Sequence, residues 1–198
     1  MALLCVRASL AIADAPPPPS DVLVVPSVRV SFAVPRGWHA LSSGDVVESR
    51  ARVQLSNPDL NRYLKQRARI PKLTFTKHPS DFPSLNPTLQ VYTQASASRT
   101  PEQIVAASLA QMSQLPGFKI VEPTHAVPIR GRRAALVRVS FPMSAAGAGE
   151  TAIVDARMLV VVEGGEAAVF GVSGRAHGDD SVDSEFQRLL ASIKPVER

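Results

Sequence analysis

Residues 151–173, TAIVDARMLVVVEGGEAAVFGVS, contain the pattern that decides the fold. Two apolar, β-branched runs flank Glu163-Gly164-Gly165-Glu166. Adjacent glycines adopt the positive φ angles that a two-residue hairpin turn requires. We therefore expect residues 151–162 and 167–173 to be antiparallel strands joined by this turn.

Other segments repeat the same signals on both sides of this hairpin. Val28, Val30, Phe32 and Val34 alternate with smaller or polar residues, which is typical of a half-buried strand. Residues 44–56 leave the element type open, and a strand through Val46-Val47 and Val53-Leu55 is one interpretation. Further strands are expected at residues 73–76, 88–95, 118–121, 126–129 and 134–141, with a turn at Arg130-Gly131-Arg132-Arg133.

Helices are expected before, within and after these strands. Thr100-Pro101-Glu102-Gln103 has the form of a capping box with proline at the first helical position, and Pro116-Gly117 ends that helix. A second helix starts at Asn57-Pro58 and stops before Pro71. The last helix, capped by Asp179 or Asp180, carries an apolar stripe of Val182, Phe186, Leu189, Leu190 and Ile193. The predicted class is α+β, with one curved, mainly antiparallel sheet and helices packed on its faces.

Several sequence segments of the chain resemble those of the PsbP-like superfamily. They are VSFAVPRGWHAL at 30–41, the capped helix after Thr100, VPIRGRRAALVRVSF at 127–141 and FQRLLASIKP at 186–195. That superfamily includes a photosystem II extrinsic protein, DcrB-type bacterial exported proteins, a Ran-binding nuclear import factor and chaperones for secretion effectors. The resemblance covers about residues 28–195 and implies an α/β/α sandwich that binds partners. No motif of a single branch is present, so no site residue is carried over.

The first 26 residues differ from the rest of the chain. Residues 1–15 are largely apolar and end in Ala13-Asp14-Ala15, the small-x-small form of a secretory cleavage site, and four prolines follow. We expect residues 1–26 to be a signal-peptide remnant with a Pro-rich lead-in, and residues 27–198 to form a single domain. The protein is then periplasmic or secreted. The alternative is a cytoplasmic protein with a disordered N-terminal arm.

Composition excludes several classes of protein. The chain has 198 residues, a net charge of +5 and 45% hydrophobic residues, enough to bury a core. Its single cysteine, Cys5, allows neither an internal disulfide framework nor a thiolate metal cluster. Cys5 follows Leu3-Leu4, so no lipoprotein anchor is expected. No apolar run reaches the roughly 18 residues of a transmembrane helix.

The sequence carries no catalytic signature. His39, His78, His125 and His177 are too far apart to pair as ligands, so no metal is expected. The glycine pairs lack the Lys-Ser/Thr of a phosphate loop, so no cofactor is expected. Ser173, His177 and Asp179 lie close together in sequence and define a minor alternative, a Ser/His hydrolase. The leading prediction is that the protein is not an enzyme.

Basic residues give the most informative functional signal of the sequence. Residues 50–77 hold eight Lys and Arg against one Asp, and Arg130, Arg132 and Arg133 form a second cluster. A basic run is usually just a solvated surface. We expect a candidate partner-binding face of Arg62, Lys65, Arg69, Arg132 and Arg133 that recognises a protein or an anionic envelope component. In the alternative, the protein is a cytosolic adaptor or chaperone, and its partner is the protein that it serves. Nucleic acid is not expected, since Tyr63 is nearly alone among the basic residues. The sequence leaves the oligomeric state open.

Overall fold

The computed structural model describes residues 22–54, 62, 71–82, 84–145, 151–178 and 182–197. It is an α+β structure, as the sequence predicts. Its elements in chain order are β1 (Val22–Val25), a 3-10 turn (Pro26–Val28), β2 (Val30–Ala33), β3 (His39–Ala40), α1 (Ser43–Arg52), β4 (Val53–Gln54), β5 (Leu73–Thr76), β6 (Thr88–Ala95), α3 (Pro101–Met112), β7 (Lys119–Ala126), β8 (Arg133–Ala145), β9 (Thr151–Glu163), β10 (Glu166–Arg175), α4 (Asp183–Ser192) and β11 (Lys194–Pro195).

The large sheet is antiparallel throughout and has the strand order β3-β5-β6-β10-β9-β8-β4, with β7 also paired to β8. The β9–β10 hairpin is confirmed, because Gly164 and Gly165 at its tip have φ angles of 56° and 86°. The strand expected at 118–121 is the start of β7, which continues to Ala126 and runs antiparallel to β8. Of the strand expected at 126–129, only Ala126 lies in β7, and Ile129 forms an isolated bridge with Arg132. The β7–β8 connection therefore spans residues 127–132.

A small second sheet, not expected from the sequence, has the order β1-β2-β11. Residues 22–25, which the sequence placed in the Pro-rich lead-in, form β1 and pair with β2. Directly after α4, Lys194 and Pro195 pair with Ser31 and Val30 of β2. The small sheet thus ties the segment that follows α4 to the first strands of the chain.

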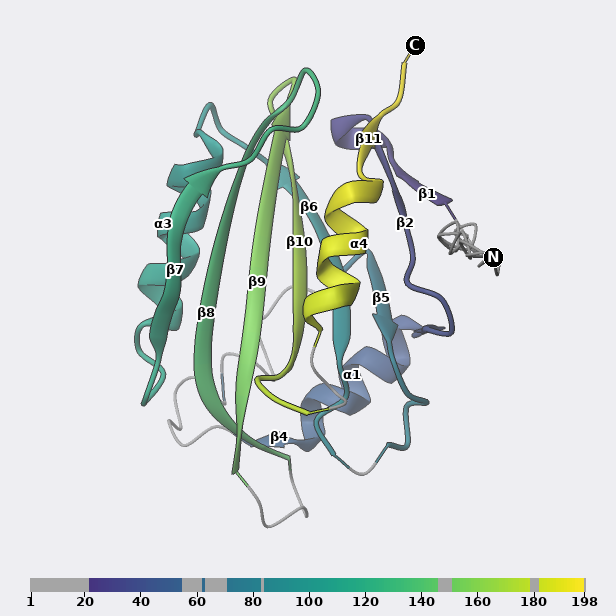
Figure 1. Cartoon of the computed structure of the whole chain (residues 1–198), viewed down its shortest axis with the longest axis vertical. Coiled ribbons are helices and arrows are strands. Elements are labelled where there is room, and N and C mark those ends of the chain that lie inside the picture. Colours follow the sequence, from purple (N-terminus) through teal and green to yellow (C-terminus); the bar gives the residue numbers. More distant parts are fainter. Residues whose placement is uncertain are drawn as a thin grey trace, which may run out of the picture.

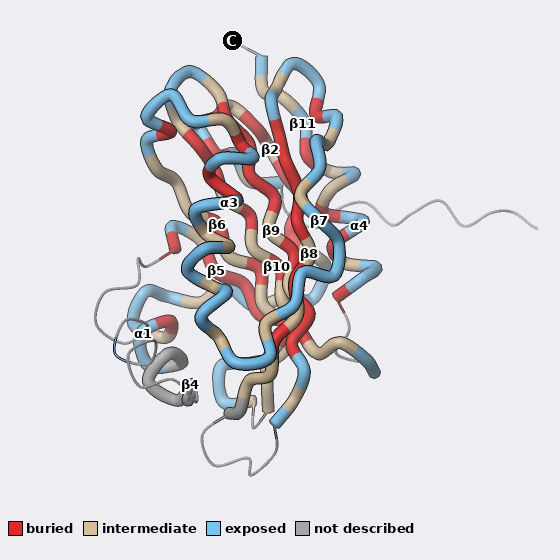
Figure 2. Tube along the Cα trace, turned by 90° about the vertical axis from the view of Figure 1, so that its left-hand side faces the viewer, coloured by how far each residue is buried: buried red, intermediate tan, exposed pale blue. Residues whose placement is uncertain are grey.

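Two hydrophobic cores lie on the two faces of the large sheet. Phe170, Leu159 and Leu136 form one cross-strand row under α4 and the small sheet, and Phe32 of β2 meets Phe170 edge-on with ring centroids 5.4 Å apart. On the other face, Ile104 of α3 packs into the second core. The curved strands separate these layers in Figure 1, and Figure 2 shows the buried stretches of the sheet behind α3. The α/β/α arrangement is confirmed.

The first helix begins at a cap that the sequence pattern does not reveal. Residues 44–56, whose element type the sequence leaves open, contain both a helix and a strand. The strand interpretation is wrong for Val46-Val47, which lie in α1, and is confirmed at Val53–Gln54, which form β4, whereas Leu55 lies outside the described residues. The Ser42 N–H and Oγ donate to Asp45 Oδ2 at 2.8 and 2.6 Å, and the Asp45 N–H donates to Ser42 Oγ at 3.2 Å. This reciprocal cap starts a helix despite the two β-branched residues.

The capping residue of α4 also differs from the prediction. The residue at the N-cap is Val182, with no side-chain cap, whereas Asp179 and Asp180 lie outside the described residues. The apolar stripe of α4 is confirmed, since Val182, Phe186, Leu189 and Ile193 are buried. The helix expected over 57–70 lies outside the described residues except for Arg62, which is helical. None of the described helices is long and apolar enough to cross a membrane.

Candidate functional site

Arg132 and Arg133, adjacent in sequence, diverge at the start of β8. Side chains of a strand alternate between its faces, and Arg133 alternates with Ala134, which packs in the core under α4. Arg133 therefore lies on the α3 side, where it is exposed. Arg132 instead turns toward the small sheet, where its Nε lies 3.3 Å from the Val28 carbonyl oxygen. The structure does not bring these two arginines together on one surface.

The other members of the predicted basic face lie in the segment after β4. Arg62 is exposed, whereas Lys65 and Arg69 lie outside the described residues. The elements α1 and β4 lie at the lower end of Figure 1, and the β7–β8 connection lies at the upper end. Partner binding by the set Arg62, Lys65, Arg69, Arg132 and Arg133 stays a prediction.

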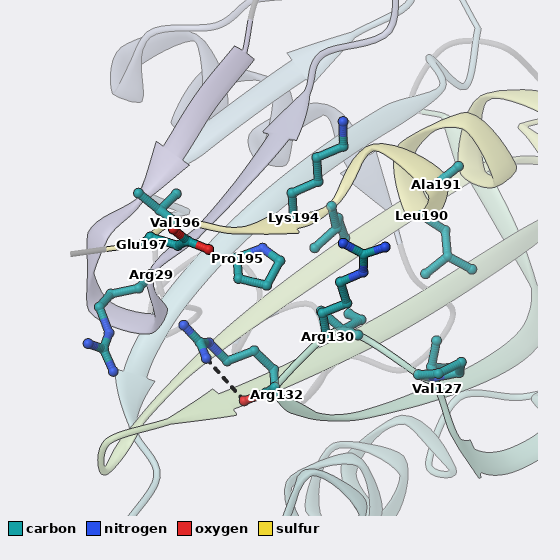
Figure 3. Close-up of a pocket in the computed structure, with 14 residues that line it drawn as sticks. Arg29, Val127, Arg130, Arg132, Leu190, Ala191, Lys194, Pro195, Val196 and Glu197 are labelled. Atoms are coloured by element: carbon teal, nitrogen blue, oxygen red, sulfur yellow. Dashed lines mark hydrogen bonds between the residues drawn. The ribbon is translucent and has the colours of Figure 1, made fainter.

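A groove of about 1150 Å³ opens between the β7–β8 connection and the end of the chain. One wall is loop 127–132, and the other is the last turn of α4 with β11 and the residues that follow it. Figure 3 shows the two walls and the side chains between them. The cationic lining residues are Arg29, Arg130, Arg132 and Lys194, and Glu197 is the acidic one. We call this feature the basic groove.

Glu163 neutralises part of the basic groove from the β9–β10 turn. Its carboxylate makes an ion pair with Arg29 Nη2, and its Oε2 lies 3.5 Å from Arg132 Nε. Arg132 Nη1 also donates to the Gly131 carbonyl oxygen at 3.0 Å, the dashed line in Figure 3. The Arg132 side chain is only 12% exposed. Arg29 and Arg132 are therefore held in place by contacts within the protein.

Arg130 and Lys194 differ from this pair. Arg130 belongs to the loop wall and Lys194 to the β11 wall, and both are exposed. Within the described ranges, no acidic side chain forms an ion pair with either of them. Two like charges that line one groove repel each other, and an anion between the walls is attracted by both. The groove is therefore best suited to a negatively charged group.

The backbone of Arg29 is unusual for an arginine. Its φ of 47° and ψ of 51° are left-handed, a conformation that favours glycine. Its carbonyl oxygen accepts the Val196 N–H at 2.8 Å, which fixes the C-terminal wall of the groove. Sequence reasoning missed both Arg29 and Lys194 as site residues. The one available signal for Lys194 was its position directly before Pro195, where the last helix must stop.

A second charged cluster lies at the opposite, N-terminal end of α4. Arg138 Nη2 and Nε donate to the buried Asp155 carboxylate at 2.8 to 3.2 Å, and Arg157 bridges Asp155 and Asp183. The hydrogen bonds to Asp155 raise the pKa of Arg138 above its ordinary value. The Arg157 guanidinium also lies 5.4 Å from the ring centre of Phe186 in α4. The ion pairs of Arg157 with Asp155 of β9 and Asp183 of α4 link the helix to the sheet, although the buried Arg157 Nη1 makes no hydrogen bond within the described part of the chain.

The residues of the hydrolase alternative are not assembled. Ser173 is in β10 opposite Ala156, whereas His177 lies exposed beyond the end of that strand. No hydrogen bond joins their side chains in the described part of the chain, and Asp179 falls outside it. Nor do three His, Cys, Asp or Glu side chains gather as a metal site among the residues that the structure describes. Among the described residues, the geometry that favours a ligand is that of the basic groove, which suits an anion.

Comparison with known proteins supports the fold. No protein-family model matches the sequence, and no curated protein matches it. Among solved structures, cyanobacterial PsbP (CyanoP) from Synechocystis sp. PCC 6803 is similar with a TM-score of 0.51 at 14% identity, over 88% of this chain and 91% of that one. LpqN, involved in cell envelope biogenesis of Mycobacterium tuberculosis, gives a TM-score of 0.46 at 15% identity, over 85% and 83%. A Pseudomonas aeruginosa protein of unknown function, PA94, gives 0.48 at 14%, over 67% and 89%.

Proposed function

The chain has a PsbP-like fold, and we propose that it is an exported, non-enzymatic binding module. In this proposal, the basic groove holds an anionic group of a protein or of an envelope component. The fold alone leaves function open, because one fold hosts many functions. The observation that carries the proposal is the pair Arg130 and Lys194, which line opposite walls of the groove without an acidic partner among the described residues.

The groove suits recognition better than a flat basic surface would. The ion pairs of Glu163 with Arg29 and Arg132 hold the base of the groove. Side chains already fixed in place lose little conformational freedom when a ligand binds. Arg130 and Lys194 are exposed, so their attraction for an anion must be weakened by salt.

Charge reversal tests the proposal directly. We would measure binding to poly-L-glutamate and to phosphatidylglycerol vesicles, at low salt and at high salt. The variant Arg130→Glu/Lys194→Glu should lose about tenfold or more in affinity, since repulsion replaces two attractions. The matched control is Lys119→Glu/Arg133→Glu, which changes the net charge equally at two exposed positions outside the groove. It should bind like the unaltered protein.

The same assay tests the basic face that the sequence predicts. The variant Arg62→Glu/Lys65→Glu/Arg69→Glu reverses the charges of that segment and leaves the groove intact. If this variant or the Arg133 control loses binding while the groove variant retains it, the predicted basic face is the binding surface and the groove is not. If no variant and no salt concentration changes binding, the proposal of an anion-binding module fails.

The runner-up function is a cytosolic adaptor or chaperone for one partner protein. It requires the same kind of groove and differs in cellular location, so the location of the native protein decides between the two. The hydrolase alternative has less support, because Ser173 and His177 share no hydrogen bond in the described part of the chain.

A further inference from the structure

We propose that the ligand of the basic groove is a peptide segment of a partner protein in which acidic and apolar side chains are neighbours. This inference rests on the proposed function and specifies the ligand class. The groove has two chemically different parts, and each part accounts for one half of such a segment.

The first half is the apolar end of the groove. Val127 and Leu190 line it from opposite walls, and both are partly buried and packed against the core below α4. Ala191 lies beside Leu190, and Figure 3 shows these residues on one side with Arg29 and Arg132 on the other. A fixed apolar wall in the same groove as Arg130 and Lys194, which have no acidic partner among the described residues, favours a ligand that presents an apolar group next to a negative charge.

The size of the groove favours a chain segment over a small molecule. Pockets for small molecules usually measure about 300–1000 Å³ and enclose most of their ligand. The basic groove measures about 1150 Å³, and both Arg130 and Lys194 at its walls are exposed. A trough of this size that stays open to solvent accommodates several residues of a polypeptide.

The groove must recognise the peptide through its side chains. A peptide that extends a sheet pairs with free N–H and C=O groups of the edge strand, so each missing N–H weakens this mode of binding. Pro195 in β11 has no N–H, and Val196 already donates its own to Arg29. Pro128 on the opposite wall also lacks a donor. Recognition therefore depends on carboxylates at Arg130 and Lys194 and on an apolar side chain at Val127 and Leu190.

A lipid surface fits these observations less well. Each basic side chain raises membrane affinity only about fivefold. Arg130 and Lys194, which have no acidic partner in the described part of the chain, line a concave groove. The large hydrophobic side chains exposed on the described surface, which could enter a bilayer, lie elsewhere. They are Val22, Val24, Val47, Ile120, Val121 and Ile153, none of which lines the groove.

Selection from a random 12-residue peptide library displayed on phage tests the ligand class. The bait is the full chain, and parallel selections use Arg130→Glu/Lys194→Glu and the control Lys119→Glu/Arg133→Glu. We expect the unaltered chain and the control to enrich peptides that combine Asp or Glu with Leu, Ile, Val or Phe. In a selected peptide, replacement of the apolar residue by Ser should weaken binding about tenfold.

Ala191→Tyr separates the two halves of the groove. Ala191 is an exposed helix position, so the larger side chain fills the apolar end without entering the core. This variant should still select acidic peptides and lose the apolar preference. Equal selection of acidic peptides with and without apolar residues overturns the ligand class but leaves anion binding intact. Binding to phosphatidylglycerol vesicles without any peptide enrichment also overturns it. Binding to none of these anions overturns the proposed function itself.

Discussion

At the scale of single residues, Arg29 shows how the sequence and the groove are linked. The chain changes direction sharply at Arg29, whose left-handed backbone joins the 3-10 turn to β2. A glycine would adopt this conformation at no steric cost, and an arginine does not. What the arginine adds is its guanidinium, which pairs with Glu163 at the base of the groove.

This strain gives a quantitative prediction. Arg29→Gly and Arg29→Ala both remove the ion pair with Glu163. The left-handed φ of residue 29 is unfavourable for alanine and costs glycine nothing. We expect the alanine variant to be less stable than the glycine variant by about 1 kcal/mol, measured as the difference in free energy of unfolding in urea. Equal stabilities would show that residue 29 is free to leave this conformation.

The alternation of residues 28–34 predicted burial correctly and missed the turn. Val28, Val30, Phe32 and Val34 are all buried, as the pattern of a half-buried strand requires. Val28, however, belongs to the 3-10 turn, and the strand begins only at Val30. A period of two reports which side chains point inward, and it does not exclude a change of backbone conformation between them.

At the scale of elements, two helices begin in the same way, and the sequence revealed one of them. The Thr100–Gln103 capping box of α3 is present as predicted. The Ser42–Asp45 box of α1 was missed because Val46 and Val47 favour a strand locally. A cap pairs two backbone donors at the helix start, and only one of the valines, Val46, is buried. The cap and this one-sided burial fit a helix.

The α1 cap should also respond to acid. Hydrogen bonds from the Ser42 hydroxyl, and next from its N–H, lower the pKa of Asp45 below its ordinary value of 3.8. The unfolded chain therefore binds this proton more readily than the folded protein does. The contribution of the cap is complete above pH 3.8 and is lost as the pH falls through the lowered pKa of the folded state.

An NMR titration of the Asp45 side chain measures this effect. In the variant Ser42→Ala the hydroxyl is absent, so the pKa of Asp45 should rise toward its ordinary value. Helical signals of α1 should then weaken at a higher pH than in the unaltered protein. An unchanged Asp45 titration in Ser42→Ala would mean that the hydroxyl does not hold the carboxylate in solution.

At the scale of the whole molecule, the sequence predicted the layers and not the groove. Hairpin turns and capping boxes are local signals, so the antiparallel sheet and α3 could be read from short segments. The groove depends on Arg29, Arg130 and Lys194, which come from distant parts of the chain. They meet because β11 pairs with β2 and because loop 127–132 lies beside the end of α4. Single-sequence patterns do not specify such pairings, so the predicted face combined basic residues by their local density.

At this scale, the proposal that the protein is exported predicts how the chain is processed. Cleavage after Ala15 would remove Cys5 and would remove none of the described residues, because β1 begins at Val22. A processed chain therefore keeps both sheets and the basic groove. We expect the intact mass of the native protein, measured in each cell fraction, to match a chain that starts at Pro16 and is found outside the cytoplasm. An uncleaved chain in the cytosol would contradict export and would favour the adaptor, whose partner would then be an acidic cytosolic protein.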